Sequence, residues 1–467
     1  MIFSSVNYLV FFLITLGFLK LLRNPLHQKI YLLLASYFFY AYWDPRFLPL
    51  MFTLSFGAYS IGKRIDSSPE LARKKQWLAL GICLDLAVLG FFKYYNFFIS
   101  NFNELLTAAG TRLPFLDILL PVGISFITFE VISYKVDIYR GENHSARSFL
   151  DVSLLVAFFP HLIAGPILKP RHFLPQLQTP ISIRGANIHD GAQIFLFGMV
   201  KKIVVADRLS IFVDPVFDSP QFYDSATLWL AVIAYAVQIY CDFSGYSDMA
   251  IGSARCMGFD IPNNFDMPYI SLSITEFWRR WHISLSTWLK EYLYFPLGGN
   301  RKGRVRQYLN LFIVMLLGGL WHGASWNFVF WGGMHGIGLA LHKMYLEHRG
   351  HWRALPKPLS ILLAWAMTFA FVCVTWVFFR SGDFKASIFI LQKMFLIVSP
   401  EGTRWLTTSL LVLAPLVVLA HWAGQRIQRY YIVNLRTLPG LFLLFFALLG
   451  ILFFMPLKSS PFIYFQF

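Results

Sequence analysis

The sequence predicts an all-α polytopic membrane protein, and three observations lead to that prediction. Of the 467 residues, 57% are hydrophobic and 14% are charged, whereas about a quarter of a soluble globular protein is charged. Apolar runs of helix length recur along the whole chain. The basic residues lie in short segments between those runs, which is the pattern that orients membrane helices. We therefore attribute the net charge of +16 to topology and to contact with membrane lipids, and expect no nucleic acid partner.

Candidate spans follow one another from the first residues onward. The first run has neither the leading positive charge nor the small-residue cleavage site of a signal peptide, so we expect it to be retained. Several runs are shorter than the roughly 20 residues that cross a bilayer, so some helices must be tilted, kinked or partial. The runs cover residues 8–22, 30–42, 47–61, 77–92, 116–134, 150–163, 194–205, 228–241, 359–379, 405–420 and 441–454.

The basic segments predict how the chain is oriented in the membrane. Those expected on the cytoplasmic side are residues 23–29, 63–75, 301–306, 343–357 and 426–436. Counting spans from either end then places the N-terminus and residues 456–467 outside the cytoplasm. No linker or internal repeat stands out, so residues 1–467 are expected to form a single domain. The four cysteines lack the spacing of metal ligands, and we expect no metal site.

An unusual apolar stretch, residues 309–341, is too long for one ordinary span and too short for two. We expect two partial helices that meet at membrane depth, with the backbone bent at Gly318, Gly319 and Gly323. Irregular backbone at that depth must be buried in protein or line a wet cavity. Ionisable residues in membrane segments are usually functional, so His322 in this break is the leading candidate. The alternative is a structural His that bonds a neighbouring carbonyl.

Residues 271–296 predict one amphipathic helix. Ser273 and Glu276 have the spacing of a capping box, and apolar residues recur at helical spacing along the segment. A basic, Trp-rich helix of this kind usually lies in the membrane interface. His282 is at the edge of the apolar face, and we expect it to point toward the site that holds His322.

Other polar residues near the spans are expected to have structural roles. Paired carboxylates in a membrane also suggest proton relay or ion binding, but pairing with Lys or Arg, or helix capping, is the favoured interpretation. The histidines of this group are expected to be packing or interface residues. The group comprises Glu130, Lys135, Asp137, His161, Asp242, Ser244, Tyr246, Asp248, Asn263, Asn264, Asp266, His335 and His342.

Four segments together resemble the membrane-bound O-acyltransferase family, and more narrowly its bacterial branch, typified by the membrane subunit of alginate O-acetylation. The resemblance implies a ring of tilted and partial transmembrane helices around a central funnel. It matches His322 to the family's near-invariant His and His282 to the His of a second motif, where other branches carry Asn or Asp. The segments are LLPVGISFITFEVISYKVDIYRG (119–141), FFPHLIAGPI (158–167), ITEFWRRWHISLSTWLKEYLYFPLGGNRKG (274–303) and LGGLWHGASWNFVFWGGMHG (317–336).

The resemblance implies an O-acetyltransferase, and the residues suit that chemistry. Moving an acetyl group from a thioester to a hydroxyl requires a base, and a neutral imidazole is suited to it. His322 is the candidate base, because burial disfavours its charged form. Donors at Trp321, Ser325 and Asn327 are candidates to stabilise the oxyanion.

The donor is expected to be acetyl-CoA from the cytoplasm, with no permanently bound cofactor. Basic side chains hold phosphates through charge-assisted hydrogen bonds. Candidates for that contact are Arg279, Arg280, Arg301 and Lys302. The alternative is that these four are only the basic residues of cytoplasmic loops.

Residues 462–467 suggest an acyl acceptor. Phe462, Tyr464 and Phe467 have the spacing of a motif in the small partner of teichoic acid D-alanylation, whose Tyr is thought to carry the acyl group. By analogy, Tyr464 is expected to accept acetyl near His322 and pass it to an extracytoplasmic, serine-hydrolase-like acetyltransferase. The alternative is an aromatic anchor in the membrane interface.

Several functions remain open on the sequence alone. The leading one is delivery of acetyl across the bacterial inner membrane for O-acetylation of an exopolysaccharide, with alginate as the first candidate. Peptidoglycan and cellulose are the next acceptors, and D-alanyl transfer to teichoic acid is a related reaction. A non-covalent transporter of an acyl or lipid-linked species also fits broken helices and a polar midplane site. A structural scaffold is the weakest alternative.

Overall fold

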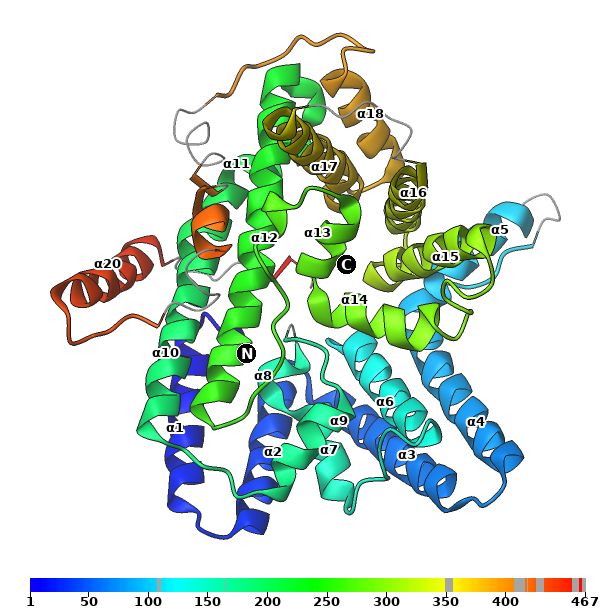
Figure 1. Cartoon of the computed structure of the whole chain (residues 1–467), viewed down its shortest axis with the longest axis vertical. Coiled ribbons are helices and arrows are strands. Elements are labelled where there is room, and N and C mark those ends of the chain that lie inside the picture. The colour runs from blue at the N-terminus through cyan, green and yellow to red at the C-terminus, as the bar shows by residue number, and fades with distance from the viewer. Residues whose placement is uncertain are drawn as a thin grey trace. The chain divides into compact units, whose positions relative to one another are not determined.

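The computed structural model describes residues 1–106, 111–163, 165–348, 356–406, 416–417, 419–425, 432–455 and 462–463. Over these residues the named elements are all helices, accompanied by a single bridge between Tyr223 and Thr403 (Figure 1). The all-α prediction is confirmed. Contacts divide the chain into a first unit, Met1–Leu196 with Tyr246–Pro262, and a second unit, Phe197–Gly245 with Asn263–Phe467. The single domain stays a prediction.

Several helices of residues 1–199 lie close to the predicted runs, but others differ. Helix α10 begins at Gly185, nine residues before the run predicted from 194, and α5 was not among the predicted runs. The run predicted to begin at 116 starts its helix only at Ile124, after Gly123 has turned the chain at φ +77° against the Leu162 carbonyl. The elements are α1 Val6–Leu21, α2 Pro25–Ala41, η1 Pro45–Phe47, α3 Leu48–Ser67, α4 Leu71–Leu89, η2 Gly90–Tyr94, α5 Tyr95–Leu106, α6 Ile124–Tyr139, α7 Phe149–Ala157, α8 Phe159–Leu162, α9 Pro170–Phe173, η4 Leu174–Gln178 and α10 Gly185–Met199.

The remaining elements carry the candidate site. Helix α12 contributes residues to both units, and the elements after it belong to the second. They are η5 Val200–Ala206, α11 Asp207–Asp218, η6 Pro220–Phe222, α12 Ser225–Cys256, η7 Pro268–Ile270, α13 Ile274–Arg280, α14 Ile283–Leu289, η8 Lys290–Tyr294, α15 Arg304–His322, α16 Trp326–His348, α17 Lys357–Arg380, α18 Phe384–Met394 and α20 Leu438–Phe454.

Three helical stretches in the described part of the chain are long and apolar enough to cross a membrane: Leu71–Leu106, Ser225–Cys256 and Lys357–Arg380. The run expected to end at residue 241 is part of α12, a helix of 32 residues that ends at Cys256. It tolerates Asp242 because the Asp242 carboxylate pairs with Lys202 and 83% of the apolar window is buried in protein. Helix α12 is therefore a protein-surrounded core helix.

Two pairs of buried ionisable side chains lie in the first unit. Glu130 Oε1 lies 2.8 Å from His161 Nε2 and accepts the Leu168 N–H at 3.1 Å. Lys135 forms a buried ion pair with Asp85. The structural roles predicted for Glu130, Lys135 and His161 are confirmed, although the partner of Glu130 is a His and not a Lys or Arg.

Candidate functional site

The central apolar stretch forms a pair of packed helices, α15 and α16, joined by a turn at residues 323–325. The prediction of two helices meeting at a break is confirmed, but the bend at Gly318 and Gly319 is wrong. Both glycines lie inside α15, where a Cβ on Gly319 would stand 2.1 Å from the Phe328 carbonyl oxygen. The small size of Gly319 allows α16 to approach closely.

The far ends of the two helices lie together. Arg304 Nε is 3.4 Å from Glu347 Oε2, and the Tyr308 hydroxyl donates to the same carboxylate oxygen at 3.0 Å. The basic segments at 301–306 and 343–348 therefore share one end of the helix pair, as a common membrane side requires. Helix α15 rises about 27 Å from Arg304 to its last residue, His322, at 1.5 Å per residue, so His322 is at the opposite end.

Aromatic rings surround His322. The side chain is 4% exposed, and its ring centroid lies 5.0 Å from that of Trp321, 5.1 Å from Trp331 and 5.3 Å from Phe379. These rings come from α15, α16 and α17, and each meets the imidazole edge to face. The packing keeps bulk water away from the imidazole.

The amphipathic segment is two helices and not the single helix predicted. Helix α13 ends at Arg280, and α14 begins at Ile283, with His282 between them at φ 45° in the left-handed region. The Asn264 carbonyl accepts the Ile283 N–H at 2.9 Å. Asn264 Oδ1 accepts the Ser284 N–H at 3.3 Å and the Ser284 hydroxyl at 2.6 Å. A distant segment thus caps α14, which allows the chain to break.

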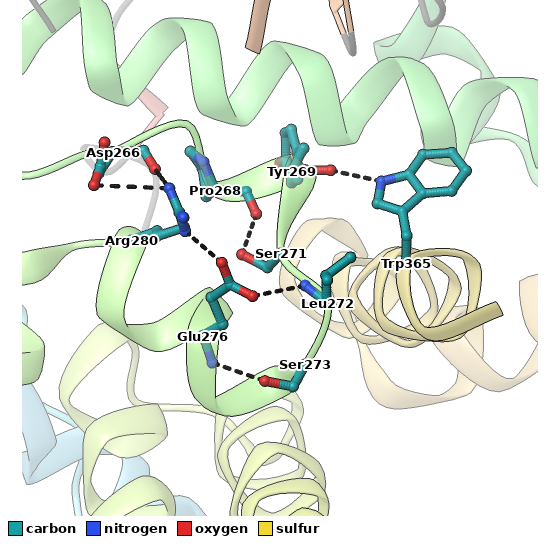
Figure 2. Close-up of polar contacts among 9 residues, drawn as sticks. All are labelled: Asp266, Pro268, Tyr269, Ser271, Leu272, Ser273, Glu276, Arg280 and Trp365. Atoms are coloured by element: carbon teal, nitrogen blue, oxygen red, sulfur yellow. Dashed lines mark hydrogen bonds and ion pairs between the residues drawn. The ribbon is translucent and has the colours of Figure 1, made fainter. Parts of the chain in front are cut away.

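The predicted capping box is present at the start of α13, with one shift of register (Figure 2). Ser273 Oγ accepts the Glu276 N–H at 3.2 Å, and Glu276 Oε2 accepts the Leu272 N–H at 2.9 Å. The apolar side chains Phe277 and Trp278 of α13 are buried in the protein. Trp278 Nε1 donates to the buried His335 Nδ1 at 3.2 Å, which agrees with the packing role predicted for His335.

The break brings His282 to His322, as predicted. His282 is completely buried, and its ring centroid lies 6.4 Å from His322, 6.1 Å from Trp321 and 4.7 Å from Phe243. Neither ring nitrogen of His282 has a hydrogen-bond partner among the residues that the structure describes. Two buried imidazoles forty positions apart therefore lie in one cluster of aromatic rings.

Replacing Asn264 by Ala tests the cap that shapes this break. The variant removes the Oδ1 atom that accepts hydrogen bonds from the buried Ser284 hydroxyl and N–H, so we expect a loss of stability of about 1–3 kcal/mol and a lower midpoint of thermal unfolding in detergent. The double variant Asn264→Ala, Ser284→Ala removes both side-chain partners and should cost less than the sum of the two single variants. Strict additivity would contradict a direct interaction.

The residues predicted to stabilise an oxyanion lie in different settings. Trp321 packs against both imidazoles, and Ser325 is half-buried in the turn. Asn327 is buried, and its Nδ2 donates to the Ser381 carbonyl at 3.0 Å. The oxyanion role of these residues stays a prediction.

The four residues predicted to contact donor phosphates differ in their surroundings. Arg280 donates to Glu276 Oε1 at 2.9 Å and to the Asp266 carbonyl at 3.0 Å (Figure 2), so it fastens α13 to the preceding segment. Arg279, Arg301 and Lys302 are exposed. Phosphate binding stays a prediction for all four.

Tyr464, the predicted acyl carrier, lies outside the described residues, but the two residues before it are described. Phe462 and Ile463 are buried. The Ile463 N–H donates to Asp242 Oδ2 at 2.8 Å, and the Phe462 ring centroid lies 5.8 Å from that of Phe243. The sequence predicted pairing with Lys or Arg, or helix capping, for Asp242. It did not predict this contact, because a carboxylate that binds a backbone N–H 221 positions away produces no sequence pattern.

The sequence of the chain is similar to those of acyl-transferring enzymes. Residues 140–381 match the model of MBOAT, the membrane-bound O-acyltransferase family. The chain is 46% identical over 388 residues, 82% of this chain and 73% of the relative, to the probable alginate O-acetylase of Pseudomonas syringae pv. tomato. It is 39% identical over 420 residues (84% and 77%) to the peptidoglycan O-acetyltransferase of Helicobacter pylori. It is 25% identical over 275 residues (56% and 69%) to the teichoic acid D-alanyltransferase of Bacillus subtilis.

Proposed function

Because the chain belongs to the membrane-bound O-acyltransferase family, as its motifs predicted, we propose that it moves acetyl groups from a cytoplasmic donor across the bacterial inner membrane. It is an acyltransferase and a membrane protein. The donor of the proposal is acetyl-CoA, and the final acceptor is an exopolysaccharide of the alginate type. The buried pair His282 and His322 is the observation that carries this proposal.

The proposed reaction assigns the base to His322. Its neutral imidazole takes the proton of an acceptor hydroxyl while the hydroxyl oxygen attacks the thioester carbonyl. The carbon–sulfur bond then breaks, and coenzyme A leaves as the thiol after taking up a proton. The aromatic rings around His322 exclude water, which would otherwise compete with the acceptor for the acetyl group. His282, 6.4 Å away between ring centroids, is the second group that faces the reacting atoms.

We assign the acceptor hydroxyl to Tyr464. The phenol would become an acetyl ester, from which a serine-hydrolase-like partner outside the cytoplasm would take the acetyl group for the polysaccharide. The support comes from residues 462 and 463, since Phe462 packs on Phe243 and Phe243 packs on His282. The Phe243 ring thus lies between the segment that precedes Tyr464 and His282 of the His pair.

The choice of alginate follows the relatives. The probable alginate O-acetylases of Pseudomonas syringae pv. tomato and Pseudomonas aeruginosa are 46% and 44% identical to the chain over 82% and 85% of its length. The peptidoglycan O-acetyltransferase, at 39% identity, makes peptidoglycan the second acceptor. The teichoic acid D-alanyltransferase is similar over only 56% of the chain, which favours acetyl over D-alanyl as the group transferred.

Incubation of the purified protein with radiolabelled acetyl-CoA tests the donor and the carrier together. We expect the wild-type polypeptide to acquire label at Tyr464, identified by mass spectrometry of the peptide, and Tyr464→Phe to acquire none. Tyr345→Phe, which alters an exposed tyrosine at the end of α16, is the matched control and should be labelled like wild type. Label that persists in Tyr464→Phe would place the acceptor elsewhere.

A further inference from the structure

A cluster of three charged side chains lies buried in the second unit. Lys202 Nζ stands 2.6 Å from Asp242 Oδ1 and 2.9 Å from Asp207 Oδ1. The three side chains are only 3%, 4% and 5% exposed for Lys202, Asp242 and Asp207 respectively. Burying charges is costly unless their geometry and hydrogen bonding are good, so a cluster of two carboxylates around one ammonium calls for an explanation.

The two carboxylate oxygens of Asp242 have different partners. Oδ1 faces Lys202, whereas Oδ2 accepts the Ile463 N–H at 2.8 Å. A hydrogen bond from a backbone N–H to a carboxylate is charge-assisted and stronger than a neutral one. Lys202 therefore fixes the orientation of the carboxylate that holds the backbone of residue 463.

The residue next to Asp242 on α12 connects this contact to the His pair. The Phe243 ring lies 5.8 Å from the Phe462 ring on one side and 4.7 Å from the His282 ring on the other, between centroids. Phe462 is fully buried and Ile463 is 5% exposed. Consecutive residues of α12 thus hold the backbone and the side chain of one short segment beside the candidate site.

We infer that Asp242, oriented by Lys202, is a positioning residue that holds residues 462–463, the two residues before the proposed carrier Tyr464, beside the Phe243 ring that contacts His282. This inference rests on the proposed role of Tyr464 as acetyl carrier. We call the Asp242–Ile463 and Phe243–Phe462 contacts together the seat of residues 462–463. Asp242 acts through the segment and does not touch the reacting atoms.

Two pairs of variants isolate the seat. Ile463→Pro deletes the N–H that Asp242 accepts, and Ile463→Val retains it. Asp242→Asn removes the charge that holds the segment. Asp207→Asn removes the other carboxylate of the same Lys202 and leaves the Asp242–Ile463 contact in place. Asp207→Asn therefore measures the effect of disturbing the buried ion pairs alone.

Photo-crosslinking reports the seating directly. A benzophenone-bearing phenylalanine is incorporated at position 462 in the full-length protein, and the crosslinked peptide is identified by mass spectrometry. We expect crosslinks to the α12 peptide that contains Phe243, reduced several-fold by Ile463→Pro and by Asp242→Asn. Ile463→Val and Asp207→Asn should retain them. Equal yields in all five proteins, or an equal loss in Asp207→Asn and Asp242→Asn, would overturn the inference.

Acetyl loading of Tyr464 supplies a second measurement that needs no modified residue. Asp242→Asn and Ile463→Pro should lower the maximal loading rate at least tenfold without changing the acetyl-CoA concentration that gives half of that rate. Combining them should cost no more than Ile463→Pro alone, because Asp242→Asn weakens the same contact that Ile463→Pro removes. An increased requirement for acetyl-CoA, or additive losses, would contradict a positioning role.

The two ideas fail in different ways. If position 462 crosslinks to α12 in an Asp242-dependent manner but Tyr464 never carries acetyl, the carrier proposal is wrong and the seat remains. If Tyr464 is acetylated at the same rate with Asn at position 242, the seat is wrong and the carrier remains.

Discussion

Replacing His322 by Ala is expected to lower acetyl transfer by a factor of about 10²–10⁴, the usual contribution of a general base. The imidazole is 4% exposed and lies within 6.4 Å, between ring centroids, of the second buried His. The rings of Trp321, Trp331 and Phe379 that surround His322 have no basic nitrogen that could take over as the base. The measurement is the initial rate of radiolabelled acetyl transfer by purified protein.

A matched His variant separates lost chemistry from lost structure. His342 lies on α16 at the opposite end of the helix pair, half-buried, with Nδ1 2.8 Å from the Thr275 hydroxyl, and His342→Ala should retain most of the activity. Both variants should elute as folded protein in size-exclusion chromatography. Undiminished passage of acetyl groups in His322→Ala would favour the transporter alternative, because transport without a covalent step needs no base.

The pairing of His282 with His322 could be predicted from the sequence, but the backbone that produces it could not. The apolar periodicity of residues 271–296 suits one continuous helix, because the signal that ends α13 is not in that segment. The break depends on the Asn264 carbonyl and side chain, which replace hydrogen bonds of the first turn of α14. Tertiary hydrogen bonds of this kind override local periodicity and leave no local pattern.

The role of the glycines in the central stretch shows a second limit of the sequence. Glycine supports both a bend and the close approach of two helices, so Gly318 and Gly319 could be assigned either role. The structure resolves the ambiguity in favour of packing for Gly319. Likewise, Asp242 was predicted to be paired, but its contact with Ile463 depends on two segments that only the fold brings together.

Replacing Gly332 by Ala is expected to force helices α15 and α16 apart. A Cβ at Gly332 would lie 2.3 Å from the Met315 carbonyl oxygen and 3.0 Å from the Gly319 Cα. Both are backbone atoms of α15, so no side chain can move aside and the helices must separate. Overpacking of this kind costs about 1–3 kcal/mol or more. Because Trp331, the preceding residue, packs on His322, acetyl transfer should fall together with the thermal unfolding midpoint.

The adjacent glycine provides the control for that prediction. A Cβ at Gly333 would meet its nearest atom, Phe312 Cε2, at 3.7 Å, which is ordinary contact, and Ala is favoured over Gly in a helix by about 1 kcal/mol. Gly333→Ala should therefore unfold at the wild-type temperature or slightly above it and retain acetyl transfer. If Gly332→Ala and Gly333→Ala behave alike, helix propensity and not the approach of α15 to α16 governs this stretch. A large loss in Gly332→Ala alone would mean that the spacing of the two helices fixes the position of His322.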